Sequence, residues 1–452
     1  MASEQALIVT DSRSFPPAIL GDSRTLSVIF GLTLLFGATA LYVTDPESYL
    51  RAMHIWVPES LAAPFADSAY IVSQLDCWRQ GVDVYVSNPC ELYHRAFAYP
   101  PLWLRLWFLP SGQHATVPFA LSLDAIFVVS LAVLPPIARG WDIALLCVAI
   151  ASSASAYGVE RGNVDLAIFI LAAFAIGVAQ HGLPFRVAGY AAVTCAALLK
   201  LYPVFLVALI ARERRWLAVG LALIATATGV AAIWLWHDQW IAMFPNIPGP
   251  EYSTDGPGGR KLPEGLFVVI DWVARHVWLA TGLHLDEVLP RRAAVAGLFA
   301  MVLLTALLIA LRQARDAAFS MTVRRLTPRE NICLTTGALL FCGCFVAGTS
   351  IAYREIFVLF ALPALLAWRH DRGLPPLVRW TAVLTIPLMW GSFPALLFDL
   401  TFGPLGPYGG PLPTFAFWLG REILWWWLFV VLAAGLFRIA DQIGLVAINR
   451  TR

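Results

Sequence analysis

The chain has 452 residues, of which 59% are hydrophobic and only 13% are charged, and its formal net charge is +2. Because soluble domains carry about 25% charged residues, this composition excludes an ordinary water-soluble protein and predicts an all-α, polytopic integral membrane protein. The basic residues stand in short clusters between apolar runs, a pattern that argues against a nucleic-acid-binding surface.

Twelve apolar runs predict membrane-spanning helices. The first of them follows a mixed polar segment and has no small-residue cleavage site behind it, so it is predicted to be an anchor and not a cleavable signal peptide. The predicted helices lie near residues 26–44, 97–111, 115–137, 141–159, 163–181, 186–211, 216–237, 291–312, 331–351, 354–369, 377–399 and 414–437.

The distribution of arginine and lysine predicts the orientation of the chain. The strongly basic connections are residues 212–215, 312–329, 369–379 and 438–452. Placing all four in the cytoplasm requires both termini inside and an even number of crossings. The apolar segment Gly265–Thr281 would, as a further crossing, move residues 312–329 outside. It carries Asp271, Arg275 and His276, so it is predicted to lie in the membrane interface as an amphipathic helix.

This topology predicts three long loops on the periplasmic side of a bacterial inner membrane. The loops comprise residues 45–96, 237–264 and 398–414. The largest directly follows the first helix, which favours chemistry on the outer face. No internal repeat is found, so the inverted-repeat signature of many secondary transporters is missing. The predicted parts of the chain are a cytoplasmic segment 1–25, a catalytic transmembrane module 26–237, a periplasmic loop with the interface helix 238–290, and C-terminal transmembrane helices 291–452.

The seven cysteines do not form a metal-binding pattern, because five of them lie in apolar runs, where free cysteine behaves as a small hydrophobe. Cys77 and Cys90 lie together in the first predicted loop. On the oxidising side of a membrane these two residues can form a disulfide. Two unpaired thiols are the alternative.

Four polar constellations stand out against the apolar background. In chain order they are Asp67-Ser68-Ala69-Tyr70 with Gly81-Val82-Asp83-Val84-Tyr85, Phe97-Ala98-Tyr99-Pro100-Pro101, Arg161-Gly162-Asn163-Val164-Asp165, and Lys200-Leu201-Tyr202-Pro203. Each is a weak signal by itself. A lone loop aspartate such as Asp67 is usually solvated surface, although a carboxylate that abuts the membrane can also remove a proton from an acceptor hydroxyl.

Lys200 is the most costly residue of these constellations. It stands twelve residues before Arg212, which is about 18 Å along a helix, and a lysine at the centre of a crossing helix costs roughly 2.5–3.5 kcal/mol. Its charge predicts a phosphate or substrate site; a structural pair with Asp165 and a snorkelling lysine are the alternatives. Pro203 breaks the helical hydrogen bonding just beyond it.

Arg354 is a second candidate cation, at the predicted outer end of the tenth helix. A guanidinium there can form a bidentate pair with a phosphate. A salt bridge with the neighbouring Glu355 or an anchor in the membrane interface is the alternative.

In this order, the constellations resemble glycosyltransferase family 87, a group of GT-C-type membrane enzymes that includes polyprenol-phosphate-mannose-dependent mannosyltransferases. The resemblance runs from the first helix to Arg215, nearly half of the chain. The family usually reads Gly-Gln-x-Asn where this chain has Glu160-Arg161-Gly162-Asn163. The matching positions are Asp67, Tyr70, Gly81, Tyr85, Tyr99, Pro100, Pro101, Gly162, Asn163, Lys200 and Pro203.

The resemblance implies inverting transfer of a mannose-like hexose from a polyprenyl-phosphate donor to an acceptor hydroxyl of a lipid or glycan, on the periplasmic face. It implies Asp67 as the general base, with cations such as Lys200 and Arg354 stabilising the leaving phosphate. The predicted substrate-binding residues are Tyr70, Tyr85, Tyr99, Asn163, Lys200 and Arg354. No cofactor is predicted, and a divalent metal is compatible with the motifs but not required by them, because the first loop has no Asp-x-Asp pair.

Two other functions are compatible with an apolar chain of this kind. A transporter or flippase of a lipid-linked glycan would explain Lys200 but gives no reason for the long first loop. A glycan polymerase or ligase usually carries its large loop later in the chain.

Overall fold

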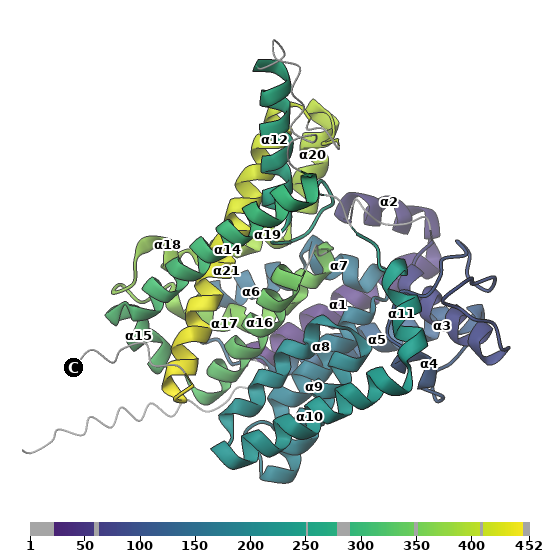
Figure 1. Cartoon of the computed structure of the whole chain (residues 1–452), viewed down its shortest axis with the longest axis horizontal. Helices are drawn as coiled ribbons and strands as arrows, with labels where there is room; N and C mark the ends of the chain where they lie inside the picture. Colours follow the sequence, from purple (N-terminus) through teal and green to yellow (C-terminus); the bar gives the residue numbers. More distant parts are fainter. Residues whose placement is uncertain are drawn as a thin grey trace, which may run out of the picture.

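The computed structural model describes residues 22–57, 63–249, 252–277, 290–347, 351–406 and 410–445. Every regular element among these residues is a helix (Figure 1). Six of the described helices are long and apolar enough to cross a membrane, and two helix pairs that bend at a short break bring the number to eight. The described chain is therefore an all-helical membrane protein, whereas the twelve crossings stay a prediction. Most of the predicted cytoplasmic segment, residues 1–21, lies outside the described residues.

The first half of the chain forms a bundle in which α1 packs against α5 and α6, and α8 packs against α9. Labels with η mark 3₁₀ helices. The elements are α1 (Ser23–Thr44), α2 (Pro46–Trp56), α3 (Ala66–Arg79), α4 (Leu102–Arg105), η2 (Gln113–Ala115), α5 (Thr116–Ser130), η3 (Leu131–Val133), α6 (Gly140–Ile150), α7 (Ser153–Glu160), α8 (Val164–Val178), α9 (Leu183–Leu199), η4 (Tyr202–Arg212), α10 (Arg215–Leu235), α11 (His237–Met243) and η5 (Phe244–Asn246).

In the second half, α14 and α16 pack against the long helix α21. α12 and α20 project beyond the rest of the bundle at the top of Figure 1. The elements are α12 (Lys261–Val277), α14 (Arg291–Arg315), α15 (Ala317–Arg324), α16 (Pro328–Ala347), η6 (Ala352–Phe357), α17 (Val358–Trp368), α18 (Pro376–Arg379), α19 (Thr381–Met389), α20 (Ser392–Phe402) and α21 (Leu412–Gln442).

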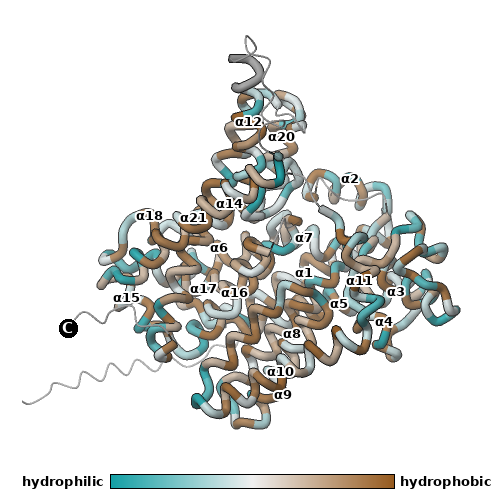
Figure 2. The backbone as a smooth tube through the Cα atoms, viewed as in Figure 1, coloured by the Kyte–Doolittle hydropathy of each residue, from teal (hydrophilic) through white to brown (hydrophobic). Residues whose placement is uncertain are grey.

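The outer surface of the bundle is apolar along whole helices. Figure 2 shows hydrophobic residues along α9 and α10, whereas hydrophilic residues gather near α15 and in the loops around α3 and α4. In α10, Leu223 and Ile224 are each 64% exposed and Trp234 is 77% exposed. Apolar side chains exposed along a helix in this way match a lipid environment, where a helix satisfies its own backbone hydrogen bonds.

The helix predicted at residues 97–111 is wrong. Only the four residues of α4 are helical there, because Pro100–Pro101 supply no N–H donors and disfavour a helical residue before them. The segment instead lies against α3, where the Arg79 guanidinium donates to the carbonyl oxygens of Trp107 at 3.0 Å and Leu109 at 2.8 Å. An apolar composition thus gave a loop where a crossing was expected.

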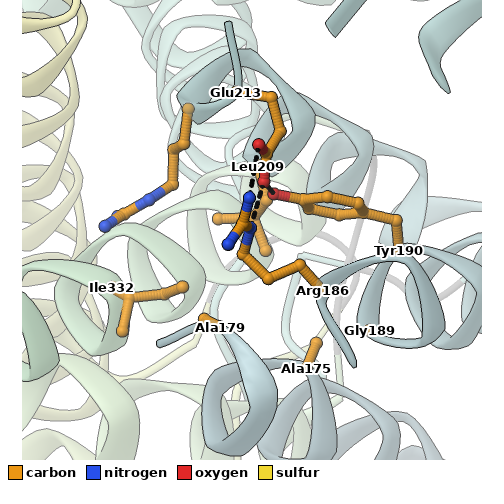
Figure 3. A pocket seen from close by; sticks show the side chains of 9 residues that line it. Ala175, Ala179, Arg186, Gly189, Tyr190, Leu209, Glu213 and Ile332 are labelled. Atoms are coloured by element: carbon orange, nitrogen blue, oxygen red, sulfur yellow. Dashed lines mark hydrogen bonds and ion pairs between the residues drawn. The ribbon is translucent and has the colours of Figure 1, made fainter. Parts of the chain in front are cut away.

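The single helix predicted at residues 186–211 is also wrong, because the chain reverses at Lys200. Lys200 is extended, with φ −147° and ψ 150°, and Pro203 lies in the first turn of η4, which runs back beside α9. Arg186, near the start of α9, therefore meets Glu213, just after η4, with Nε donating to Oε1 at 2.6 Å (Figure 3). Lys200 lies at the tip of this helical hairpin.

The described residues of the basic connections lie together at one end of the bundle. Arg212 donates to the amide oxygen of Asn331 at 3.0 Å, and Arg325 lies 3.9 Å from the carboxylate of Asp371. A small cavity lined by Arg212 and Asn331 also contains Gln442, the last residue of α21. These contacts agree with the prediction that the basic connections share one side.

The predicted interface segment contributes to the helix α12, which packs against α14 and α21. Phe267 is buried, whereas Ile270 is 47% exposed and Trp272 is 53% exposed. One side of α12 therefore packs on the bundle and another presents apolar side chains outward. Its place in a membrane interface stays a prediction, and residues 278–289 lie outside the described residues.

Candidate functional site

A cavity of about 700 Å³ is lined by the tip of the α9–η4 hairpin, whereas Arg212, in the first basic connection, stands at the far end of η4. This volume falls within the range of roughly 300–1,000 Å³ that is typical of ligand sites. Five of the seven predicted site residues line it, although they come from segments far apart in the sequence. Its charged, aromatic and amide side chains are Asp67, Tyr70, Arg95, Tyr99, Arg161, Lys200, Tyr202, Asn246, Tyr353 and Arg354.

Asp67 is positioned by the docking of α3 on the turn between α7 and α8. The N–H of Asp67 donates to the carbonyl oxygen of Arg161 at 3.0 Å, and the Ser68 hydroxyl donates to the carbonyl oxygen of Gly162 at 2.7 Å. Gly162 has a φ of +53°, and a Cβ at this position would collide with Ser68 and Ala120. The turn therefore needs glycine both for its left-handed backbone and for the close approach of α3.

The carboxylate of Asp67 is held by Arg161 and Asn163. Arg161 Nε donates to Oδ2 at 2.8 Å and Nη2 to Oδ1 at 2.6 Å, and the Asn163 amide donates to Oδ2 as well. Burial alone would raise the pKa of Asp67, but Arg161 and Asn163 lower this pKa below its usual value. An ionised carboxylate accepts about four hydrogen bonds. Oδ1 accepts only one of the three hydrogen bonds from Arg161 and Asn163, so it can accept another from a hydroxyl group in the cavity.

Asn163 lies behind the residues that line the cavity and does not line it itself. Its side-chain oxygen accepts the N–H of Asp165 at 2.8 Å and so caps α8, while its amide holds Asp67. The residue is fully buried. The Gly-Asn pair thus couples the start of α8 to the carboxylate. The structure places Asn163 where it positions Asp67, and its predicted contact with substrate stays a prediction.

Lys200 and Arg354 converge on a single carboxylate, that of Asp165. Lys200 Nζ forms an ion pair with Oδ1, and Arg354 Nε lies 3.3 Å from Oδ2. The Tyr202 hydroxyl donates to Oδ1 at 2.7 Å, and Asp165 is fully buried. The structural pair with Asp165 that the sequence left open for Lys200 is therefore present, and Lys200 lines the cavity at the same time.

Aromatic rings form much of the remaining wall. The Tyr70 hydroxyl donates to the carbonyl oxygen of Ala96 at 2.7 Å and accepts the N–H of Ala98 at 2.8 Å. Lys200 lies 5.2 Å from the ring centroid of Tyr99, within the range of a cation–π contact. Tyr85 is buried and donates to the carbonyl oxygen of Tyr99 at 3.2 Å, so it supports the wall instead of lining the cavity.

Cys77 and Cys90 form a disulfide, which decides between the two interpretations left open by the sequence. Cys90 directly precedes Glu91, whose buried carboxylate pairs with Arg95 at 2.6 Å. The Arg95 guanidinium lies over the ring of Tyr70, 4.7 Å from its centroid. The disulfide thus fixes a loop that carries one cation to the cavity.

Sequence reasoning missed two of the charged residues in this site, Arg161 and Arg95. Arg161 stands at the position where the chain departs from the pattern of the resembling family, and an unexpected charge beside a matched motif was the signal that could have found it. Arg95 stands just before the Phe-x-Tyr-Pro-Pro motif. Its role depends on the fold of the disulfide loop, which no local pattern reveals.

Comparison of the chain with protein-family models, with curated proteins and with solved structures found no match. Within the described residues, no group of three or more His, Cys, Asp or Glu side chains is arranged to hold a metal ion. The inference of function therefore rests on the geometry of the cavity and on the resemblance of the motifs.

Proposed function

We propose that the protein is a membrane glycosyltransferase of GT-C type that transfers a mannose-like hexose from a polyprenyl-phosphate donor to an acceptor hydroxyl of a cell-envelope lipid or glycan. One observation carries the proposal. The fixed, ionised carboxylate of Asp67 and two cations, the buried Lys200 and the half-buried Arg354, line the same cavity. The order of the motifs, which resembles glycosyltransferase family 87, supports it independently.

The charges of the cavity favour an anionic donor. Four cationic side chains and one carboxylate line it; two further carboxylates, Glu91 and Asp165, pair with these cations from behind the wall. The seven charges together sum to +1, which matches the single negative charge of a phosphodiester. In a site of low dielectric such a charge attracts an anion more strongly than it would in water.

In the proposed reaction, the acceptor oxygen attacks the anomeric carbon while the bond from that carbon to the phosphate oxygen breaks. The hydroxyl proton passes to Oδ1 of Asp67, the oxygen with remaining hydrogen-bond capacity. The polyprenyl phosphate leaves with both electrons of the broken bond, and Lys200 and Arg354 stabilise its charge. A single displacement of this kind inverts the anomeric centre.

The orientation follows from the positive-inside rule. The described residues of the basic connections lie at one end of the bundle, and the cavity lies at the end of η4 that is far from Arg212, so we propose that the cavity faces the periplasm of a bacterial inner membrane. In this proposal the short apolar helices α9 and η4 are counted as two passes in place of one, which compensates for the lost crossing at residues 97–111. The proposed topology therefore keeps twelve crossings, although not the twelve that the sequence suggested.

The test is a transfer assay with the full-length protein in lipid nanodiscs, using radiolabelled polyprenyl-phosphate mannose and an extract of cell-envelope lipids and glycans as acceptor. We expect label to move from the donor to an acceptor with the wild type and not with Asp67→Asn. A transporter of lipid-linked glycan would move the intact donor across the membrane of a proteoliposome and leave its sugar–phosphate bond whole. That result would contradict the proposed transferase.

A further inference from the structure

A second cavity lies between α20 and α21, beside the loop that precedes α12, and shares no residue with the central cavity. Its volume of about 260 Å³ is just below the roughly 300–1,000 Å³ of drug-sized ligand sites, so it fits one small ring. The side chains that carry its chemistry are Asp255, Ser392, Asp399, Thr414, Phe417 and Arg421.

Arg421 provides a buried donor in this cavity. Its side chain is only 7% exposed and forms an ion pair with Asp255, which also accepts a hydrogen bond from the Ser392 hydroxyl. Within the described part of the chain, Nε of Arg421 has no hydrogen-bond partner. A buried donor of this kind is uncommon in folded proteins, and a ligand oxygen would satisfy it.

Asp399 provides an acceptor on the α20 side of the same cavity. Its side chain is partly exposed, and among the residues that the structure describes it has no side-chain hydrogen bond or ion pair. Phe417 adds an apolar ring, which stacks on Phe398 with the centroids 4.5 Å apart. The cavity therefore combines a donor, acceptors and an aromatic surface.

This combination selects the class of ligand. An anion is disfavoured because two carboxylates, Asp255 and Asp399, line the cavity against one arginine. A metal ion is disfavoured because Arg421 occupies the same wall and the described residues contain no metal-binding group there. A purely apolar ligand would bury charged groups without hydrogen bonds. Sugar hydroxyls both donate and accept hydrogen bonds, and the C–H face of a sugar ring can pack on Phe417.

The second cavity is linked to the central one through η6. Arg354 lines the central cavity, and the next residue, Glu355, is buried within electrostatic range of Asp255 and Arg421. Of two consecutive residues in one short helix, one therefore lines the central cavity and the other lies near two charged residues that line the second cavity. A glycan long enough to pass η6 could occupy both.

We infer that the cavity between α20 and α21 binds one ring of a neutral saccharide. In the reaction proposed above this ring belongs to the acceptor glycan, and that assignment rests on the proposed function. The inference that the cavity binds a saccharide ring does not depend on the proposed function.

The experiment is saturation-transfer-difference NMR on the full-length protein in nanodiscs, with methyl α-mannopyranoside as the probe. We expect transfer to the ring protons with the wild type and an affinity at least about tenfold weaker in Asp399→Leu, which removes the acceptor, and in Ala395→Phe, which fills the cavity. Asp238→Leu is the matched control, because the Asp238 side chain is fully exposed, and it should bind like the wild type. Circular dichroism and thermal unfolding check that each variant is folded.

Wild-type affinity in folded Ala395→Phe would place the sugar elsewhere and overturn the inference, as would displacement of the sugar by inorganic phosphate. Asp67→Asn should keep the wild-type signal, because it alters only the central cavity. A wild type that binds sugar in the Asp399-dependent manner but transfers none from a lipid donor would refute the transferase and leave this site standing. Transfer by Asp399→Leu at wild-type efficiency, with sugar binding lost, would refute only the assignment of the ring to the acceptor.

Discussion

The two charged groups of the central cavity hold their charges in different ways. Asp67 is matched one to one by Arg161, which gives a neutral pair with a fixed carboxylate. Asp165 is shared by Lys200 and Arg354, which gives a triad with a net positive charge. A general base needs an ionised, oriented carboxylate, and a leaving phosphate needs a fixed cation. One cavity can therefore hold both a neutral group with a fixed carboxylate and a group with net positive charge, because the ratio of cations to carboxylates differs between them. The proposed function uses the first group as the base and the second as the phosphate site.

The largest effect is expected for Asp67→Asn. The substitution keeps the size of the side chain and removes the proposed base, so turnover should fall about 100- to 10,000-fold. Donor affinity should stay within about threefold, because in the proposed mechanism the triad holds the phosphate. Turnover is measured by the transfer assay and donor affinity by equilibrium binding of radiolabelled donor.

The control for this variant addresses the buried charge it leaves on Arg161, since an unpaired buried ion costs roughly 3–5 kcal/mol of stability. Asp67→Asn combined with Arg161→Gln removes both charges and should unfold near the wild-type temperature while remaining inactive. Near wild-type turnover in either folded variant would end the assignment of Asp67 as base.

For Lys200→Met we expect a smaller effect, and we expect it on donor affinity instead of on turnover alone. It leaves the triad neutral, with Arg354 and Asp165 paired, so donor affinity should fall about 10- to 100-fold, the range of one hydrogen bond to a charged group. Lys200→Arg keeps the charge with another shape and should retain part of the affinity. If Lys200→Met were folded, bound donor normally and lost only turnover, the two groups of the cavity would not differ as proposed.

Arg161→Met should shift the pH profile of the reaction. Arg161 lowers the pKa of Asp67, so in the wild type the carboxylate stays ionised, and its contribution to stability is present, above the usual Asp pKa of about 3.9. The ionised state of Asp67 and its contribution to stability are lost only as the pH falls through the lowered pKa of the folded state. Without the cation, burial raises the pKa, and the acid limb of kcat/KM should move up by about one to three pH units. An unchanged acid limb would show that Arg161 does not tune the base.

The smallest effect on turnover is expected for the disulfide. Cys77 and Cys90 close a short loop, which corresponds to about 3 kcal/mol of stability, so Cys77→Ser with Cys90→Ser should lower the thermal unfolding temperature while the base and the triad remain in place. Cys147→Ala, which removes a thiol outside the disulfide, is the control and should leave the unfolding temperature nearly unchanged. Recovery of Cys77 and Cys90 as free, alkylatable thiols from oxidised membranes would remove the crosslink from this account.

The sequence predicted the members of the site better than the path of the chain. From the order of the motifs, Asp67 and Lys200 were predicted to belong to the same site, and the structure places both in one cavity. Apolar composition, however, could not reveal that Pro100–Pro101 prevent a helix or that residues 186–211 form a hairpin, because hydropathy does not record where a chain reverses. The pairing of Asp67 with Arg161 spans 94 positions, and only tertiary packing determines such a contact.

The most direct test of the central claim is a cryo-electron microscopy structure of the inactive Asp67→Asn variant with a polyprenyl-phosphate mannose donor bound. The account predicts the donor phosphate within ion-pair distance of Lys200 and Arg354, with the anomeric carbon exposed toward residue 67 and room for an acceptor oxygen between them. A donor phosphate bound elsewhere, for example at the basic connections near Arg212, would contradict the claim that one cavity holds both the base and the phosphate-binding cations.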